Sequence, residues 1–287
     1  MDVGIGLPNT VPGTGGEVLT GWAGRAEQAG FSTLGTIGRL VYDGYEELVA
    51  LAAAAAVTSR IRLTTSVLLA PLYANAALLA KQAASLDRLS GGRFVLGLGV
   101  GGREDDFAVS GIDMAARGRR FDAQLETMKR IWRGEVQGVA GPVGPRPARD
   151  GGPELILAGG AEVSFRRVAR LADGWILGGG TPQMFAQGAA AVDAAWRDAG
   201  REGRPRKLCL AYFCLGDGAR QHADAYLRRY YGWLGDMAGQ IAAGAAVSKE
   251  MAAGYAAAFG EAGCDELIFV PTTSGLEQVD LLADAIR

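Results

Sequence analysis

The sequence predicts an α/β protein, a (β/α)8 TIM barrel that forms one domain over residues 1–287, with extra helices before the last strand. Two observations carry this prediction. Short apolar or β-branched runs alternate with helical patterns eight times, and glycine, at 44 residues, clusters where those runs end. Strands separated by helices pair in parallel through right-handed crossovers. Eight such units favour a closed barrel, with its active site at the C-terminal ends of the strands.

The elements follow one another in a regular order. The predicted strands are the runs 3–7, 33–37, 61–67, 94–98, 154–158, 175–177, 208–215 and 267–270. The predicted helices, amphipathic or rich in alanine, are 18–30, 46–58, 76–89, 117–132, 163–172, 182–200, several segments in 219–263, and 276–286. The first strand ends in Leu7-Pro8-Asn9. An open dinucleotide-binding sheet requires Gly-x-Gly-x-x-Gly at that point, so the closed barrel is favoured.

Two segments exceed a simple strand–helix repeat. Residues 134–153 are rich in glycine and proline without periodicity, which predicts a long loop and a candidate lid. Residues 219–263 predict a helical insertion, either on the same face as the active site or as a packing subdomain.

Composition excludes several classes of function. The 29 Lys and Arg against 31 Asp and Glu leave no basic surplus for nucleic acid. The apolar stretch 48–57 is half the length that a bilayer requires, and the N-terminus lacks a leader pattern. Three cysteines argue against a disulfide framework or a zinc cluster. We therefore expect a cytoplasmic protein with a small-molecule substrate and no metal, nucleic-acid or membrane partner.

Glycine runs follow two neighbouring strands and open onto helices. Gly159, Gly160 and Ala161 follow one strand, and Gly178, Gly179 and Gly180 follow the next. Free N–H groups at a helix N-terminus bind anions, so this pattern predicts a phosphate site. The alternative is that the glycines only form tight turns. Gly97 and Gly99 lie within a strand, where glycine indicates the close approach of a flat ring or of another backbone.

Acid–base residues are scarce. The single histidine, His222, lies in a polar helical stretch and is interpreted as a surface residue. The candidates at strand ends are Arg39, Tyr42, Asp43, Tyr73, Asn75, Arg103, Glu104 and Asp106, although 103–106 reads as a solvated charged loop. The strand ends offer few groups that could transfer a proton and many glycines that let another surface approach the backbone closely. This combination favours an enzyme in which a bound cofactor carries out the chemistry.

The segment LDRLSGGRFVLGLG at 86–99 resembles the signature of the bacterial luciferase-like flavin and deazaflavin (F420) oxidoreductases. Four further segments, 23–31, 58–67, 117–132 and 154–175, agree with that family in order and spacing. The resemblance implies a (β/α)8 barrel that uses reduced FMN or F420. It also implies a homodimer, and a separate flavin or F420 reductase if the protein is a monooxygenase. The small residues of helices 46–58 and 76–89 permit close packing in such a dimer, and the alternative is that these helices only pack against the barrel.

The resemblance further implies where the cofactor binds. Its ring would lie over a bulge at Ser66 and Val67, where relatives often have a cis peptide, with Leu7 and Gly99 nearby. Its phosphate would lie on Gly159, Gly160 and Ala161, beside a wall formed by Gly178, Gly179 and Gly180.

Two departures from the family concern proton transfer. Gly38-Arg39 stands where many relatives carry Asp-His, and Tyr73-Ala74 where they carry Arg-His. An alcohol dehydrogenation that needs a histidine base is therefore disfavoured. Arg39 and Tyr73 remain candidate catalytic residues, and with Tyr42 they are candidate substrate contacts. Arg39 could hold an anionic substrate or a ring carbonyl, or pair with Asp43.

The sequence therefore predicts an oxidoreductase or monooxygenase that works by hydride transfer from, or oxygen activation at, a reduced flavin or deazaflavin. One alternative is a non-catalytic flavin-binding barrel. Another is a phosphate-binding isomerase or lyase without redox chemistry, which would need a Glu or Lys base at a strand end.

Overall fold

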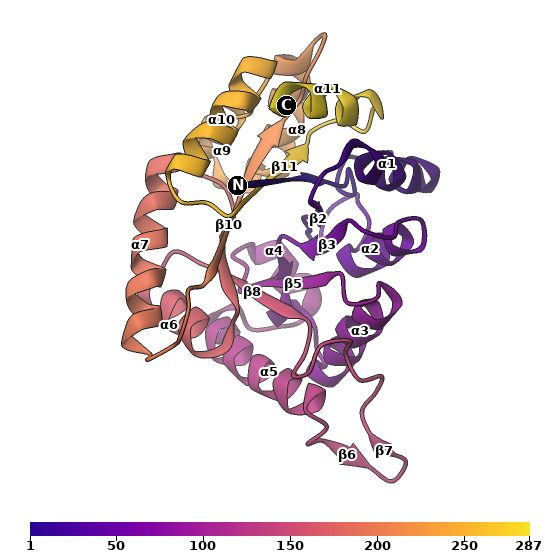
Figure 1. Cartoon of the computed structure of the whole chain (residues 1–287), viewed down its shortest axis with the longest axis vertical. Helices are drawn as coiled ribbons and strands as arrows, with labels where there is room; N and C mark the ends of the chain where they lie inside the picture. The colour runs from indigo at the N-terminus through magenta and orange to yellow at the C-terminus, as the bar shows by residue number, and fades with distance from the viewer.

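The computed structural model describes all residues 1–287 and forms a closed barrel of eight parallel strands surrounded by helices (Figure 1). The strands are β1 (Asp2–Gly6), β2 (Thr33–Thr36), β3 (Arg62–Thr65), β5 (Phe94–Gly99), β8 (Glu154–Ala158), β9 (Gly174–Leu177), β10 (Arg206–Phe213) and β11 (Glu266–Pro271). Each pairs in parallel with the next strand along the chain, and β1 pairs with β11 to close the ring. The predicted barrel and strand order are confirmed.

Helices connect the strands on the outside of the ring. They are α1 (Gly16–Ala29), α2 (Glu47–Ala56), α3 (Ala76–Leu89), α5 (Arg117–Trp132), α6 (Glu162–Leu171), α7 (Pro182–Asp198) and α11 (Glu277–Ile286), with α8 to α10 before β11. Short elements missing from the prediction are β4 (Leu68–Leu69), η1 (Ala70–Leu72), α4 (Glu104–Ser110) and η2 (Met114–Ala116). No helix of the chain is both long and apolar enough to cross a membrane.

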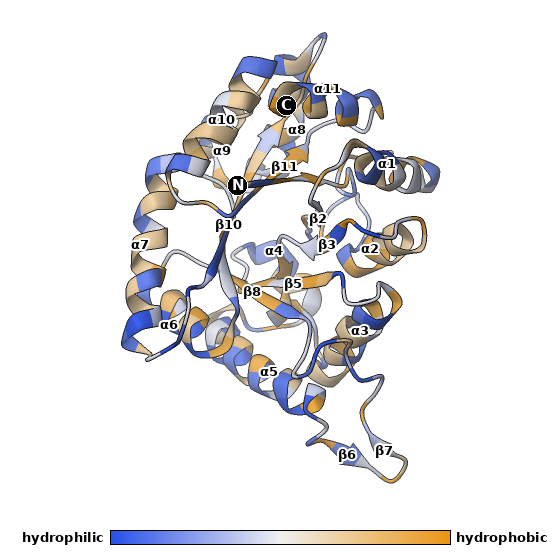
Figure 2. Cartoon of the chain, viewed as in Figure 1, coloured by the Kyte–Doolittle hydropathy of each residue, from blue (hydrophilic) through white to orange (hydrophobic).

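Alternation along the strands divides the apolar core into two layers. On β10, Leu208 and Leu210 point into the barrel, whereas Cys209 and Ala211 face the surrounding helices. This follows from the pleat, which sends successive side chains to opposite faces. On α5, apolar and polar stretches alternate, as Figure 2 shows, so the helix presents an apolar side to the strands.

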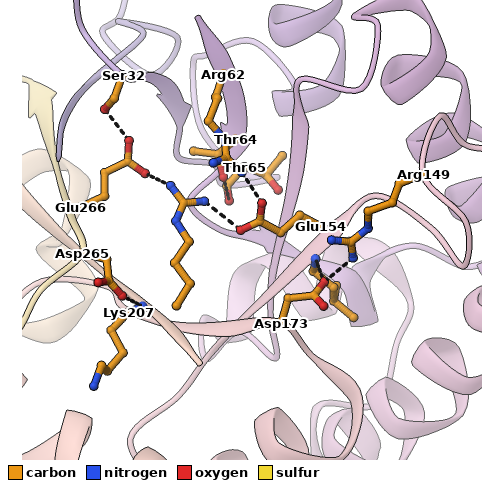
Figure 3. A network of polar contacts seen from close by, with 12 residues as sticks. Ser32, Arg62, Thr64, Thr65, Arg149, Glu154, Asp173, Lys207, Asp265 and Glu266 are labelled. Atoms are coloured by element: carbon orange, nitrogen blue, oxygen red, sulfur yellow. Dashed lines mark hydrogen bonds and ion pairs between the residues drawn. The ribbon is translucent and has the colours of Figure 1, made fainter. Parts of the chain in front are cut away.

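Charged residues close the N-terminal end of the barrel. Arg206 donates to Glu154 Oε1 at 2.8 Å and to Glu266 Oε2 at 2.5 Å, and Arg62 also pairs with Glu154. Ser32 Oγ donates to Glu266 at 2.5 Å (Figure 3). These residues begin or precede five different strands, and the Glu266 side chain is 1% exposed. The network therefore fills the end of the barrel opposite the predicted active site.

The 134–153 segment lies at this same N-terminal end, so its prediction as a lid over the active site is wrong. It leads from the C-terminus of α5 to the start of β8, and it contains a hairpin of β6 (Gln137–Gly138) and β7 (Gly141–Pro142). Lys81 donates to Gly144 O, and Ala148 N donates to Asp87 Oδ2. Connections from a helix to the next strand lie opposite the strands' C-terminal ends. Figure 1 shows the hairpin projecting away from the barrel.

The helices of 219–263 are α8 (Ala219–Tyr230), η3 (Gly232–Leu234), α9 (Asp236–Ala243) and α10 (Lys249–Glu261). Tyr226, Leu227 and Tyr230 of α8 belong to the same apolar cluster as the inward-facing residues of the strands. We infer that α8 covers part of the barrel's C-terminal mouth, the end at which the sequence places the active site.

Candidate active site

The bulge at the end of β3 forms one wall of the candidate site. The Ser66–Val67 peptide is cis, as the family resemblance implies. Ser66 is 3% exposed, and its Oγ has no hydrogen-bond partner. Val67 is partly buried and packs against the cluster inside the barrel.

Gly97 and Gly99 accommodate this bulge. A Cβ on Gly97 would lie 1.9 Å from Thr65 O, and a Cβ on Gly99 would lie 2.8 Å from Val67 Cγ2. Thr65 Oγ1 also bonds both the N–H and the carbonyl of Gly97. Of the two surfaces that the sequence allowed, another backbone is therefore the one that approaches Gly97, and a side chain approaches Gly99.

The N-terminus of α6 forms the predicted anion cradle. Gly159 has φ +140°, and a Cβ there would lie 2.4 Å from Ser164 Oγ. Trp175 Nε1 donates to Gly159 O at 2.9 Å and holds the turn. The N–H groups of residues 160–163 donate no hydrogen bond within the chain, and Ala161 supplies no side-chain cap. Free N–H groups and the positive end of a helix dipole favour a phosphate here.

The second glycine run lies at the start of α7, after the neighbouring strand β9. Gly179 and Gly180 have φ of +118° and +144°. Thr181 caps the helix by accepting from Met184 N, and Pro182 follows it. Fewer N–H groups are therefore free than at α6, so this run is better suited to a neighbouring wall than to a second phosphate site.

Arginine and tyrosine side chains meet at the mouth of the barrel. Arg39, after β2, donates to Tyr230 O and to Asp105 Oδ2, both at 2.8 Å. Its guanidinium lies 5.3 Å from the Tyr42 ring centre and 5.8 Å from that of Tyr230. The partner of Arg39 is therefore Asp105 rather than Asp43, and the arginine is held by α8.

Arg103 and Asp106 are buried at the same place, so the prediction of a solvated loop at 103–106 is wrong for these two residues. Asp106 is 0% exposed, accepts from Val41 N at 2.8 Å and lies 3.6 Å from Arg103 Nη1. Arg103 donates to Gly38 O and lies over the rings of Tyr230 and Trp233. Sequence reasoning missed these contacts because the partners lie about 65 or more residues apart in the chain.

A cavity of about 270 Å³ opens beside this cluster. Leu40, Leu69 and Leu72 supply its apolar lining, and Arg39, Glu46, Glu47 and Tyr73 supply its polar groups. Tyr73 Oη donates to Glu46 Oε1 at 2.5 Å. Burial and the neighbouring glutamates raise the pKa of Tyr73, so Tyr73 is a neutral hydrogen-bond donor and not a base.

Glu47 is one of the cavity residues that the sequence did not single out. It begins α2, is 8% exposed and lines the cavity. Desolvation raises the pKa of its carboxyl to about 7. The one sequence signal was its place at the start of the helix that follows β2. Its pattern, Glu46-Glu47 before an apolar run, is that of an ordinary helix start.

Other predicted residues have structural surroundings. Leu7 is 1% exposed and belongs to the layer between strands and helices, so its side chain does not face the site. The Tyr42 hydroxyl is buried without a hydrogen-bond partner, beside Tyr230. His222 is exposed on α8, as expected.

Several buried polar atoms without partners gather at this end of the barrel. They are Asn9 Oδ1, Arg39 Nε, Tyr42 Oη, Ser66 Oγ, Arg103 Nε and Asp106 Oδ2. Buried polar atoms are normally hydrogen-bonded. Their gathering beside a phosphate cradle fits a polar ring system with a phosphate tail, and the residues present therefore suit FMN or F420.

A closed parallel barrel with free N–H groups at a helix start and convergent polar groups at its C-terminal end has the arrangement of a TIM-barrel active site. The chain belongs to the luciferase-like monooxygenase family, whose model matches residues 1–268.

Individual relatives match only part of the chain. An uncharacterized protein of Mycobacterium tuberculosis is 36% identical over 172 residues, which cover 56% of this chain and 60% of the relative. A 4-hydroxyprotoasukamycin monooxygenase of Streptomyces nodosus subsp. asukaensis is 37% identical over 40% of this chain and 28% of its own length. The match thus spans less than two thirds of these curated relatives.

Solved structures share the fold over the whole chain. An F420-dependent secondary alcohol dehydrogenase superposes with a TM-score of 0.83 at 15% identity, covering 100% of this chain and 99% of the other. The monooxygenase RslO1 from Streptomyces bottropensis gives 0.79 at 23% identity, covering 100% and 98%.

Proposed function

We propose that the protein is an oxidoreductase that binds a reduced flavin or deazaflavin, FMN or F420, at the C-terminal end of its barrel. The observation that carries this proposal is the row of free N–H groups at residues 160–163, on the strand ends that also hold the unpartnered polar atoms. The relatives support both cofactors, since one is named F420-dependent and others are named monooxygenases.

Each part of the site has a distinct task in this proposal. The bound cofactor supplies hydride transfer or oxygen activation. Residues 160–163 hold its phosphate, while Ser66 and Val67 support one face of its ring. Arg39 and Arg103 place positive charge beside the ring and the substrate, and α8 excludes water from the barrel mouth. The leucines around the cavity favour a small substrate with an apolar part.

Equilibrium titration of the apoprotein with FMN and with F420, oxidised and reduced, tests the proposal. Each is followed by its own absorbance and fluorescence. Binding of one cofactor identifies it and sets the assays, which are oxygen consumption for a monooxygenase and oxidation of the reduced cofactor by substrate for a reductase. If neither binds in either redox state, the proposal is refuted.

A second candidate function is a phosphate-binding isomerase or lyase. It requires a Glu or Lys base at the C-terminal end of the barrel, and Glu47, at the start of the helix after β2, lines the cavity there. Turnover of a phosphorylated carbonyl compound without added cofactor would favour it. A non-catalytic flavin-binding barrel would instead bind cofactor without turnover.

We also propose a homodimer through α2 and α3. Val49 on α2 and Leu78 on α3 are 64% and 54% exposed, so these two packed helices both present a large apolar side chain to solvent. Size-exclusion chromatography with light scattering measures the mass directly, and a monomer at micromolar concentration would contradict the proposal. If the protein is a monooxygenase, a separate reductase supplies its reduced cofactor.

A further inference from the structure

We propose that Glu47 is the proton donor of the active site and protonates the oxygen atom of a small carbonyl substrate in the cavity beside Gly38. This inference rests on the proposed function, because the hydride must come from the reduced cofactor. It assigns the proton-transfer step to a residue on α2, in a chain whose only histidine is exposed on α8.

Gly38 makes room for the Glu47 carboxyl. A Cβ on Gly38 would lie 1.9 Å from Glu47 Oε1 and 2.1 Å from Cδ. The backbone of Gly38 does not have a positive φ, so its conformation does not require glycine. The absence of a side chain at residue 38 is therefore explained by the carboxyl that occupies the space. This is the position, just after β2, where the family resemblance led us to look for a proton-transfer residue.

The Glu47 carboxyl is buried but not neutralised by a partner. It accepts a hydrogen bond only from its own backbone N–H, and no ion pair involves it. Of the charged groups around it, Glu46 and Asp106 favour its protonated form, and Arg103 favours its ionised form. Tyr73, after η1, and Tyr230, on α8, face it as neutral hydroxyls, and Arg39 lines the same cavity. A structural carboxylate in such a place would normally be paired. This one is exposed to the cavity instead.

The neighbouring acids are less suited to donate a proton. Glu46 already accepts from Tyr73 Oη and from Val49 N, so its oxygens are engaged by two donors within the protein. Asp106 is 0% exposed, bonds Val41 N and does not line the cavity. Glu47 therefore combines access to the cavity with a site that favours its protonated form.

The step balances as follows. The C=O π bond of the substrate breaks, its carbon receives a hydride supplied by the reduced flavin or deazaflavin, and its oxygen receives the proton of Glu47. The products are an alcohol, the oxidised cofactor and a Glu47 carboxylate, which takes a proton from solvent through the open side of the cavity. A general acid whose pKa lies near the working pH serves this role best.

The first experiment titrates the carboxyl in the apoprotein, without cofactor. Infrared difference spectra from about pH 4 to about pH 9 follow the protonated carboxyl band. We expect a band that is lost with a midpoint near pH 7 and that is missing from Glu47→Gln. Glu261→Gln, at the exposed end of α10, is the matched control and keeps the band. If the wild type loses no carboxyl band above about pH 5.5, the proposal is overturned.

A second variant moves the carboxyl without removing it. Gly38→Ala must displace the Glu47 side chain, so the midpoint should fall toward the ordinary value for a glutamate. Gly254→Ala on α10 is the control, because a Cβ there meets nothing within 4 Å. If Gly38→Ala keeps the midpoint near pH 7, the carboxyl does not occupy the assigned position and the proposal fails.

The third experiment measures turnover and separates this inference from the proposed function. The oxidation of whichever reduced cofactor binds is followed with cyclohexanone and with benzaldehyde. We expect kcat/KM to fall about 100-fold or more in Glu47→Gln, with the cofactor Kd unchanged. Wild-type kcat should decline as pH rises through about 7. Normal turnover by the variant, or no reduction of either carbonyl by the wild type, overturns the inference. Failure to bind any cofactor refutes the proposed function instead.

Discussion

Glu27 and Glu47 are chemically identical side chains whose surroundings move their pKa values in opposite directions. Glu27 lies on α1, and its carboxylate accepts from the backbone N–H groups of Ser59, Arg60 and Ile61. Desolvation alone would raise the pKa of Glu27, but these hydrogen bonds lower it to about 2. Glu47 accepts only from its own backbone N–H, and desolvation raises its pKa to about 7. One group therefore stabilises the fold when ionised, and the other when protonated.

Replacing Glu27 with glutamine should destabilise the protein by about 1–2 kcal/mol at neutral pH, since three N–H groups lose a charged acceptor. The lowered pKa means that this contribution is present above the unfolded value of about 4.5 and is lost as pH falls toward 2. Urea unfolding at about pH 7 and about pH 3 measures it. A loss that is equal at both values would contradict the explanation.

Replacing Glu47 with glutamine should have the opposite pH dependence. Because the pKa of Glu47 is raised, its carboxyl stabilises the wild type fully below the unfolded pKa of about 4.5. This stabilisation is lost as pH rises through about 7. The variant has no carboxyl to ionise at residue 47, so its stability does not change in this way. It should therefore gain about 3 kcal/mol relative to the wild type between about pH 5 and about pH 8. Denaturant unfolding of both proteins at the two values checks this, and parallel pH profiles would contradict it.

At the scale of single elements, the start of α6 offers the sharpest test of the cofactor site. Gly159→Ala places a Cβ 2.4 Å from Ser164 Oγ at a φ of +140°. The cradle must deform, and we expect the cofactor Kd to rise about tenfold or more, which corresponds to about 1.4 kcal/mol. Gly263→Ala is the control, because Gly263 also has a positive φ but open space around it. Equal cofactor affinity in both variants would show that the cofactor phosphate does not bind at the start of α6.

The elements that periodicity defines were predictable, and those that depend on distant partners were not. The predicted strands and helices agree with the structure to within a few residues. The reason is that the spacing of apolar residues within each element indicates which of its side chains are buried. Residues 103–106 carry three acids and one arginine, which reads as a solvated loop. Tertiary contacts with Val41 and Tyr230 bury Arg103 and Asp106 there. Glu47 was missed for the same reason, since only the neighbouring Gly38 and the cavity distinguish it from a helix-start glutamate.

At the scale of the whole molecule, the barrel is closed at one end by charge and at the other by α8. Arg206 links Glu154 and Glu266 across the N-terminal end. Desolvation opposes the charge of Arg206, but the two glutamates more than offset it and raise the pKa of the arginine. The guanidinium of Arg206 therefore keeps its positive charge between the two glutamates.

Arg206→Met should cost about 3 kcal/mol of unfolding free energy, since it leaves Glu266 buried without a counter-charge. Arg204→Met is the matched control. Arg204 pairs with Asp265 on the surface and is 66% exposed, so its loss should cost less than about 1 kcal/mol. Thermal or urea unfolding compares the two, and equal losses would show that the network does not contribute as described.

The hairpin at the N-terminal end offers a place for a chemical handle. Val139 lies at its tip, fully exposed, whereas all three cysteines of the chain are buried. Val139→Cys should therefore react with a maleimide dye at that one thiol, which mass spectrometry of the labelled protein verifies. The dye, or a surface to which the protein is coupled, would stand at the far end of the barrel from Glu47. Binding and turnover could then be recorded on immobilised molecules whose active-site openings all face the solution.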